Sequence, residues 1–198
     1  SEVVNDIINN SWGTDTDCTG QGSCRSAIGT TTYDNWEDTA QLATPKISVF
    51  SAGNEGTDQP SAECQTMAYN TTLSAVSVCV VATSHYTGSS YNVADGALAS
   101  FSNKCGKASA YCIAAPGDYL WSLDHASNGE EFNSGTSMAA PMVSGGLALI
   151  MQEFSSLTPS QVVNRLLTTA NDSGEYSQSS IYGHGLMNLN AATAAIAK

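Results

Sequence analysis

Two short stretches of this 198-residue chain are apolar along nearly their whole length: Lys46–Ala52, KISVFSA, and Ala75–Ala82, AVSVCVVA. A strand with one wet face alternates apolar and polar residues, whereas a strand covered by helices on both faces does not. Weaker runs of the same kind, bounded by turn residues, lie at Asp6–Ser11 and Tyr111–Ala115. The four runs predict an α/β fold, a parallel sheet with helices on both faces.

The connections between these runs are long enough to hold the helices that a parallel sheet requires. A crossover helix is expected at Asp34–Ala43. The stretch Ser137–Phe154 is apolar nearly all round, which predicts a helix buried within the domain. Thr158 and Pro159 suit the N-cap and first position of a further helix. That helix should pack on the outside of the core through one apolar stripe: Val162, Val163, Leu166 and Leu167.

The C-terminal part of the chain is more polar. Asp172–Tyr182 is rich in serine and glycine and is predicted to be a loop, and an alanine-rich helix is expected from Leu186 onward. No internal repeat or low-complexity tract divides the chain, so we expect residues 1–198 to form a single unit.

The charge of the chain argues against two classes of partner. Six Lys and Arg against eighteen Asp and Glu give a net charge of −12, which opposes binding to nucleic-acid phosphates and to anionic membrane surfaces. The most apolar stretch, Met138–Met151, contains serine and glycine and is too short to span a bilayer. We therefore expect no nucleic-acid partner and no membrane contact from this segment, and we interpret the acidic surface as an ordinary solvated exterior.

Six cysteines favour disulfides over a metal site, because the chain has no C-x-x-C motif and no histidines at zinc spacing. Cys18 with Cys24, and Cys105 with Cys112, bracket short stretches rich in Gly, Ser and Lys, which leaves Cys64 for Cys79. The alternative is that some of them, above all this last pair, are free buried thiols. If the pairs form, the protein belongs in an oxidising compartment.

The stretch Gly135–Pro141, GTSMAAP, leads Ser137 onto the first turn of the predicted apolar helix. A hydroxyl at a helix N-terminus lies in positive potential, beside unpaired backbone N–H groups that can donate to a developing oxyanion. Gly135 allows close passage of backbone, and the alanines that follow keep the helix surface low. Taken alone, a serine in this position is most often an N-cap.

A second motif, SVFSAGNEG, ends a predicted strand with Asn54 between Gly53 and Glu55. A fixed carboxamide N–H can stabilise the negative charge of a tetrahedral intermediate, and one such donor is worth about 10²–10³ in rate. The alternative is a turn-forming asparagine that tolerates left-handed dihedral angles.

Both motifs resemble those of the subtilisin-like serine proteases. The resemblance implies that Ser137 is the nucleophile and that Asn54 is the side-chain donor of the oxyanion hole. It extends to IINNSWG at Ile7–Gly13, which resembles the strand on which these proteases lay the substrate backbone. It implies two substrate-binding segments, which we name the strand wall (Ser11, Trp12 and Gly13) and the loop wall (Ser51, Ala52 and Gly53).

Within the strand wall, Trp12 either shapes the primary pocket or fills core, and the usual burial of tryptophan favours core. The floor of the pocket is expected within Cys64–Leu73. Two further stretches also resemble the family, ASFSNKCGKASAYCIAAPG with its Ala115–Gly117, and the closing YGHGLMNLNAA.

The cysteine-bearing form of these motifs is similar to secreted or autotransported bacterial enzymes, which implies a secreted, extracellular or cell-surface location. The chemistry that the resemblance implies requires no cofactor. The family often carries structural calcium, for which no residue of this chain is assigned.

The family's aspartate and histidine motifs do not occur in this sequence. His85, His125 and His184 match no catalytic context, and each is interpreted as a surface or loop residue. The resemblance therefore implies that an upstream segment supplies Asp, His and the N-terminal strands, pairs beside Ile7–Ser11, and leaves this chain nearly inactive by itself. We predict the serine-bearing part of an endopeptidase that acts on proteins or peptides; the alternative is an inactive pseudoprotease or peptide-binding module.

Overall fold

The computed structural model describes residues 6–84, 96–124 and 126–195, and it contains a four-stranded parallel sheet in the order β1-β2-β3-β4. The strands are β1 (Ile7–Asn10), β2 (Ile47–Ser51), β3 (Ser77–Ser84) and β4 (Cys112–Asp118). They coincide with the four apolar runs, which confirms the predicted parallel α/β fold. Register is continuous across the sheet, since Asn10 pairs with Phe50, Phe50 with Cys79, and Cys79 with Cys112.

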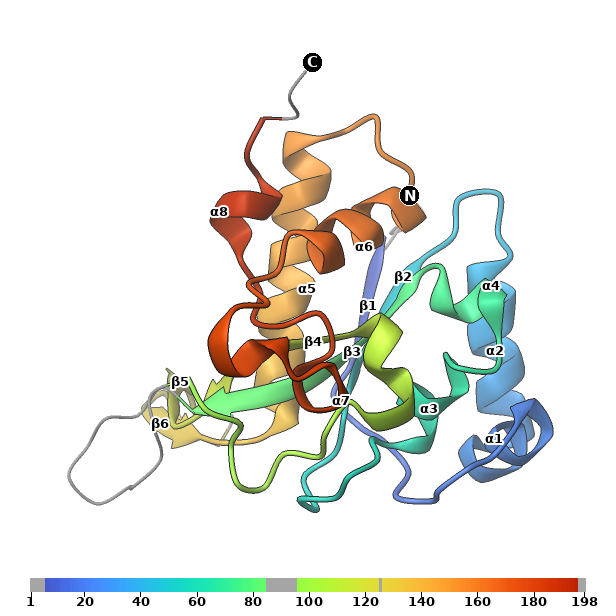
Figure 1. Cartoon of the computed structure of the whole chain (residues 1–198), viewed down its shortest axis with the longest axis horizontal. Helices are drawn as coiled ribbons and strands as arrows, with labels where there is room; N and C mark the ends of the chain where they lie inside the picture. The colour runs from blue at the N-terminus through green and yellow to red at the C-terminus, as the bar shows by residue number, and fades with distance from the viewer. Residues whose placement is uncertain (1–5, 85–95, 125, 196–198) are drawn as a thin grey trace.

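Helices cover both faces of this sheet, as Figure 1 shows with α1 to α4 on one side of the molecule and α5, α6 and α8 on the other. The first core lies under α5 (Thr136–Glu153) and α6 (Pro159–Thr168) and includes Val49 and Val80. The second core lies under α2 (Thr30–Ala40), α3 (Ala62–Thr66) and α4 (Thr71–Ser74) and includes Phe50 and Val81. Successive strand residues enter opposite cores because their side chains point to opposite faces.

The remaining elements are short. A β-hairpin follows β4 directly and leads into α5, pairing β5 (Leu120–Leu123) with β6 (Glu130–Asn133) in antiparallel fashion. The others are α1 (Gln21–Ile28), the 3₁₀ helices η1 (Gly106–Tyr111) and η2 (Gly174–Ser177), α7 (Ser179–Tyr182) and α8 (Leu189–Ala192).

The helices between β1 and β2 differ from the expected one. Helix α2 begins at Thr30, four residues before the predicted start, and ends at Ala40. Its first turn consists of threonines, which are poor helix formers, yet burial of Tyr33 and Trp36 against the sheet holds that turn in place. The polar helix α1 was not predicted, because it buries only Cys24 and so carries little apolar periodicity.

Helix α6 agrees with the sequence in detail. Thr158 and Gln161 form a reciprocal capping box, Pro159 occupies the first turn, and the apolar stripe is buried.

Helix α5 differs in one respect, because its expected burial on all sides is wrong. Met142 and Leu149 are 45% and 48% exposed. Within the described residues, the sheet and α6 cover only one side of the helix, so the apolar residues on its other side face outward.

The C-terminal expectations need two corrections. The segment predicted as a loop contains η2 and α7, which place Tyr182 in the second core. The alanine-rich helix starts at Leu189 rather than Leu186, because Leu186 bridges Ala114 and Asn171 in extended conformation.

The three predicted disulfides are confirmed: Cys18–Cys24, Cys64–Cys79 and Cys105–Cys112. None of the six cysteines is free. The second bond ties α3 to β3, and the third ties the start of η1 to the start of β4.

Candidate active site

Ser137 is the second residue of α5, directly after the hairpin. The Gly135 N–H donates to the Gly117 carbonyl at 2.7 Å, which joins the start of the helix to the end of β4. A Cβ atom on Gly117 would lie 2.7 Å from the Cβ of Ala82 and 2.8 Å from the Gly135 oxygen, so no side chain fits there. The Ala115–Gly117 stretch singled out in the sequence therefore sets where the helix of Ser137 begins.

Asn54 lies just beyond β2 and is attached to that same helix start. Its Oδ1 accepts hydrogen bonds from the Thr136 N–H at 2.8 Å and from the Thr136 hydroxyl at 3.0 Å. The Gly53 N–H in turn donates to the Thr136 Oγ1 at 3.2 Å. Thr136 was not singled out from the sequence, although it stands inside the serine motif.

With its oxygen held, the Asn54 carboxamide directs its nitrogen toward the space above Gly135. A Cβ atom at Gly135 would lie 3.6 Å from Asn54 Nδ2 and 3.6 Å from the backbone nitrogen of Ser137. Two nitrogen donors therefore lie beside the place that a side chain at residue 135 would take, and the Met138 sulfur lies 3.5 Å from the same place. Such a pair of donors can hold a single negatively charged oxygen.

The strand wall meets Ser137 through reciprocal hydrogen bonds. The Ser137 hydroxyl donates to the Ser11 carbonyl at 3.2 Å, and the Ser11 hydroxyl donates to the Ser137 carbonyl at 2.8 Å. The Ser51 hydroxyl of the loop wall lies 3.4 Å from the Trp12 carbonyl of the strand wall. The structure thus brings together Ser137, Asn54 and both walls from three separate parts of the chain, since Asn54 directly follows the loop wall.

The expectation that Trp12 fills core is wrong. Its side chain is 46% exposed and packs edge-on against Phe50 with ring centroids 6.0 Å apart. It borders an apolar cavity of about 190 Å³ between β1 and α2, which Trp36 and Ile28 also line. Trp12 lies two residues beyond the end of β1 at Asn10, so it is not part of the sheet.

Asn103 supports the loop that carries Asn54, and the sequence offered no signal for this beyond its place in the fourth family-like stretch, ASFSNKCGKASAYCIAAPG. Its Oδ1 accepts from the N–H groups of Glu55 and Thr57 at 3.1 and 2.9 Å. Its Nδ2 donates to the Ala52 carbonyl at 3.0 Å and to the Glu55 carboxylate at 2.7 Å. Asn103 itself is only 3% exposed, and of these four bonds the one to the Ala52 carbonyl is buried while the other three are partly buried.

The segment that joins the two walls is Ser61–Glu63. It lies just upstream of Cys64–Leu73, where the floor of the primary pocket is expected. A Cβ atom on Gly13 would lie 2.7 Å from the Ser61 Cβ and 3.4 Å from the Glu63 Oε2. Burial raises the pKa of Glu63 above its usual value, against the opposing effect of hydrogen bonds from Thr14. The sequence did not indicate this acid, because a single glutamate in a polar stretch has no distinguishing pattern.

One of the three histidines falls within the described residues. The His184 Nε2 lies 3.0 Å from the Ala110 carbonyl, and its side chain borders cavities that Ser137 does not line. His85 and His125 lie outside the described residues.

Across residues 6–84, 96–124 and 126–195, no group of three or more His, Cys, Asp or Glu side chains is placed to hold a metal ion. Over the same part of the chain, no helix combines the length and apolarity needed to cross a membrane.

Solved structures share this fold. The chain superposes on a patellamide maturation protease with a TM-score of 0.66, at 26% identity, over 95% of this chain and 61% of that one. It also superposes on the subtilase cytotoxin SubAB with a TM-score of 0.69, at 21% identity, over 95% of this chain and 57% of that one.

Curated proteins are also similar to this chain in sequence. Serotype-specific antigen 1 of Mannheimia haemolytica is 35% identical over 150 residues, which cover 73% of this chain and 15% of that protein. Subtilisin DY of Bacillus licheniformis is 44% identical over 80 residues, 40% of this chain and 28% of that protein. The chain thus spans less than a third of the length of these relatives. The sequence profile of the subtilase family matches residues 3–185, so the chain belongs to the subtilase family.

Proposed function

We propose that this chain is the serine-bearing part of a serine endopeptidase with Ser137 as its nucleophile. The observation that carries the proposal is the attachment of Asn54 to the start of α5, which leaves two N–H donors beside Ser137. A pseudoprotease or peptide-binding module would have no use for this pair of donors. Membership of the subtilase family supports the same reaction class.

In the proposed reaction, the Ser137 Oγ forms a bond to the carbonyl carbon of the scissile peptide. Its proton passes to a histidine base and then to the leaving amine as the C–N bond breaks. The resulting acyl-enzyme is hydrolysed by water. The negative oxygen of each tetrahedral intermediate accepts hydrogen bonds from Asn54 Nδ2 and the Ser137 N–H.

The substrate main chain lies between the strand wall and the loop wall in this proposal. Peptides that bind in extended form are held mainly by backbone hydrogen bonds, which suits walls built from small residues apart from Trp12. The carbonyl of Ser11 now accepts the Ser137 hydroxyl, so the nucleophile and the peptide-binding backbone are already adjacent.

The histidine and aspartate come, in this proposal, from an upstream segment outside this chain. Among the described residues β1 pairs with β2 alone, so its other edge is free to accept a strand. The exposed apolar side of α5, with Met142 and Leu149, offers a second contact surface. A cavity of about 720 Å³ connects that side with Ser137 and the hairpin, where the segment that carries the base would lie. Without its base, such a triad loses about 10⁶ in turnover, so this chain alone should be nearly inactive.

We further propose that the enzyme works outside the cytoplasm. Its three disulfides suit an oxidising compartment. The relative from Serratia marcescens, 34% identical over 112 residues, is named an extracellular serine protease.

Labelling with a fluorophosphonate tests the proposal. The full-length protein should be modified at Ser137 and should cleave a peptide substrate, whereas Ser137→Ala should lose both properties. Ser144→Ala is the matched control, because Ser144 lies two turns further along the same helix and bonds Asn9 instead of bordering the donor pair. Peptide binding without labelling of Ser137 would overturn the proposal in favour of a binding module.

A further inference from the structure

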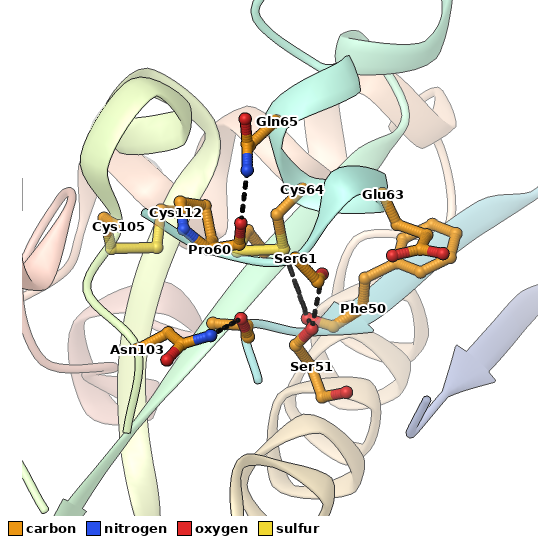
Figure 2. Close-up of a disulfide and its surroundings, with 12 residues drawn as sticks. Phe50, Ser51, Pro60, Ser61, Glu63, Cys64, Gln65, Asn103, Cys105 and Cys112 are labelled. Carbon is orange, nitrogen blue, oxygen red and sulfur yellow. Dashed lines mark hydrogen bonds between the residues drawn. A yellow bond between two sulfur atoms is a disulfide. The ribbon is translucent and has the colours of Figure 1, made fainter. Parts of the chain in front are cut away.

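The two walls of the cleft are joined by one short segment, Ser61–Glu63. The Ser61 N–H donates to the Ala52 carbonyl at 2.8 Å, and the Ser61 hydroxyl donates to the Ser51 carbonyl at 3.2 Å. Figure 2 shows Ser61 directly beside Ser51, with Glu63 two residues further along the chain in the first turn of α3. On the other side, the Ala62 N–H donates to the Thr14 carbonyl at 2.9 Å. This bridging segment therefore contacts the loop wall through Ser61, and through Ala62 it contacts Thr14, the residue that follows the strand wall.

Glu63 completes the attachment to Thr14. Its Oε2 accepts from the Thr14 N–H at 2.9 Å, and its Oε1 accepts from the Thr14 hydroxyl at 2.9 Å. The side chain is fully buried, and none of the ion pairs between described residues includes it. A buried carboxylate satisfied by neutral donors is costly for stability, so Glu63 is poorly explained as a stabilising residue.

The bridging segment itself has little freedom to move. Cys64 is bonded to Cys79 of β3, and the Gln65 amide donates to the Pro60 carbonyl at 2.7 Å. Gly13 passes so close to Ser61 that a methyl group would not fit between them. If the hydrogen bonds to Thr14 are lost, the strand wall should therefore move while the bridging segment stays in place.

We propose that Glu63 is a positioning residue that sets the strand wall for extended peptides, an inference that rests on the proposed protease function. At its Ser11 end, the strand wall is bonded to Ser137. Beyond its Gly13 end, the next residue, Thr14, is bonded to Glu63. Loss of the Glu63 carboxylate loosens only the second end, because it removes two bonds to Thr14 and leaves the bond from the Ala62 N–H to the Thr14 carbonyl. The loss of peptide affinity should consequently grow with the length of peptide that lies along the strand wall. The rate of bond formation at Ser137 should not change.

The test compares Glu63→Ala and Glu63→Gln in the full-length protease, after titration of active sites with a fluorophosphonate. A tetrapeptide anilide that spans the wall is compared with a single-residue ester. For Glu63→Ala the KM of the tetrapeptide should rise about 10-fold, with kcat nearly unchanged and the KM of the ester unaltered. Glu63→Gln should restore the KM to within about 3-fold, because the amide oxygen can accept from the Thr14 N–H while its NH₂ donates to the Thr14 hydroxyl.

Glu37→Ala is the matched control, since this carboxylate also accepts one neutral amide donor, from Asn70, but lies on α2 away from both walls. Equal rises in KM for both substrates, or a Glu63→Ala enzyme with the kinetics of Glu37→Ala, would overturn the inference. If Glu63→Ala does not fold, Thr14→Ala removes the hydroxyl bond alone and should raise the tetrapeptide KM about 3-fold. An unchanged KM in that variant would also overturn it.

Failure of the proposed protease function has a different signature, namely a wild-type protein that neither labels nor turns over either substrate. The inference about Glu63 is then decided by calorimetric binding of the same tetrapeptide as its amide. Weaker binding by Glu63→Ala than by Glu37→Ala supports the positioning role, and equal binding contradicts it.

Discussion

Replacing Asn103 with alanine tests how much its side chain stabilises the loop that carries Asn54. The side chain makes four hydrogen bonds, two from backbone N–H groups of that loop and two to the Ala52 carbonyl and the Glu55 carboxylate. The carbonyl keeps a second donor in the Ser61 N–H, and the loop N–H groups can reach water once the side chain is gone. At about 1 kcal/mol for each hydrogen bond lost, the free energy of unfolding should fall by about 3–4 kcal/mol.

Urea unfolding of the full-length protein, followed by tryptophan fluorescence, measures this loss. The same variant should turn over substrate about 10-fold more slowly, because the oxyanion donor on the loosened loop is less well placed. Asn171→Ala is the matched control: its side-chain oxygen accepts two hydrogen bonds from Ser173, but at the exposed surface. That change should cost less than about 1 kcal/mol. A loss for Asn103→Ala equal to the control, with unchanged turnover, would refute the reasoning.

Three further outcomes are expected. Gly53→Ala should lower the free energy of unfolding by at least about 2 kcal/mol in urea melts, because residue 53 has φ +104° and a Cβ would lie 2.3 Å from Asn103 Nδ2. Gly20→Ala, where nothing lies within 4 Å, should cost less than about 1 kcal/mol, the loss expected at the N-cap of α1. Equal losses for the two variants would contradict the argument. Asn54→Ala should reduce kcat by about 10²–10³ with KM little changed, whereas a KM effect alone would assign Asn54 to binding. Burial raises the folded-state pKa of Glu63 above its ordinary 4.5, so the contribution of this group to stability is fully present below pH 4.5 and is lost as the pH rises through the raised pKa. Urea melts at a series of pH values from 4.5 upward should show the wild type losing stability relative to Glu63→Gln. Parallel curves of stability against pH would contradict the assignment.

Local patterns in the sequence determined much of this molecule. Four apolar runs located the strands, and the cap and stripe of Thr158–Leu167 located α6, because a buried strand or half-buried helix leaves its period in the residues themselves. The family motifs likewise placed Ser137 at a helix start and Asn54 at a strand end, since each depends on a few adjacent residues.

Only the tertiary structure decided what surrounds these elements. Helix α5 is apolar on all sides in sequence, but burial depends on what covers it, and one side faces outward. Thr136, Asn103 and Glu63 hold the cleft through partners 82, 48 and 49 residues away in the chain. A polar side chain carries no periodic signature of its distant partner, because that partner is chosen by which loops the parallel strands deliver to the same edge of the sheet.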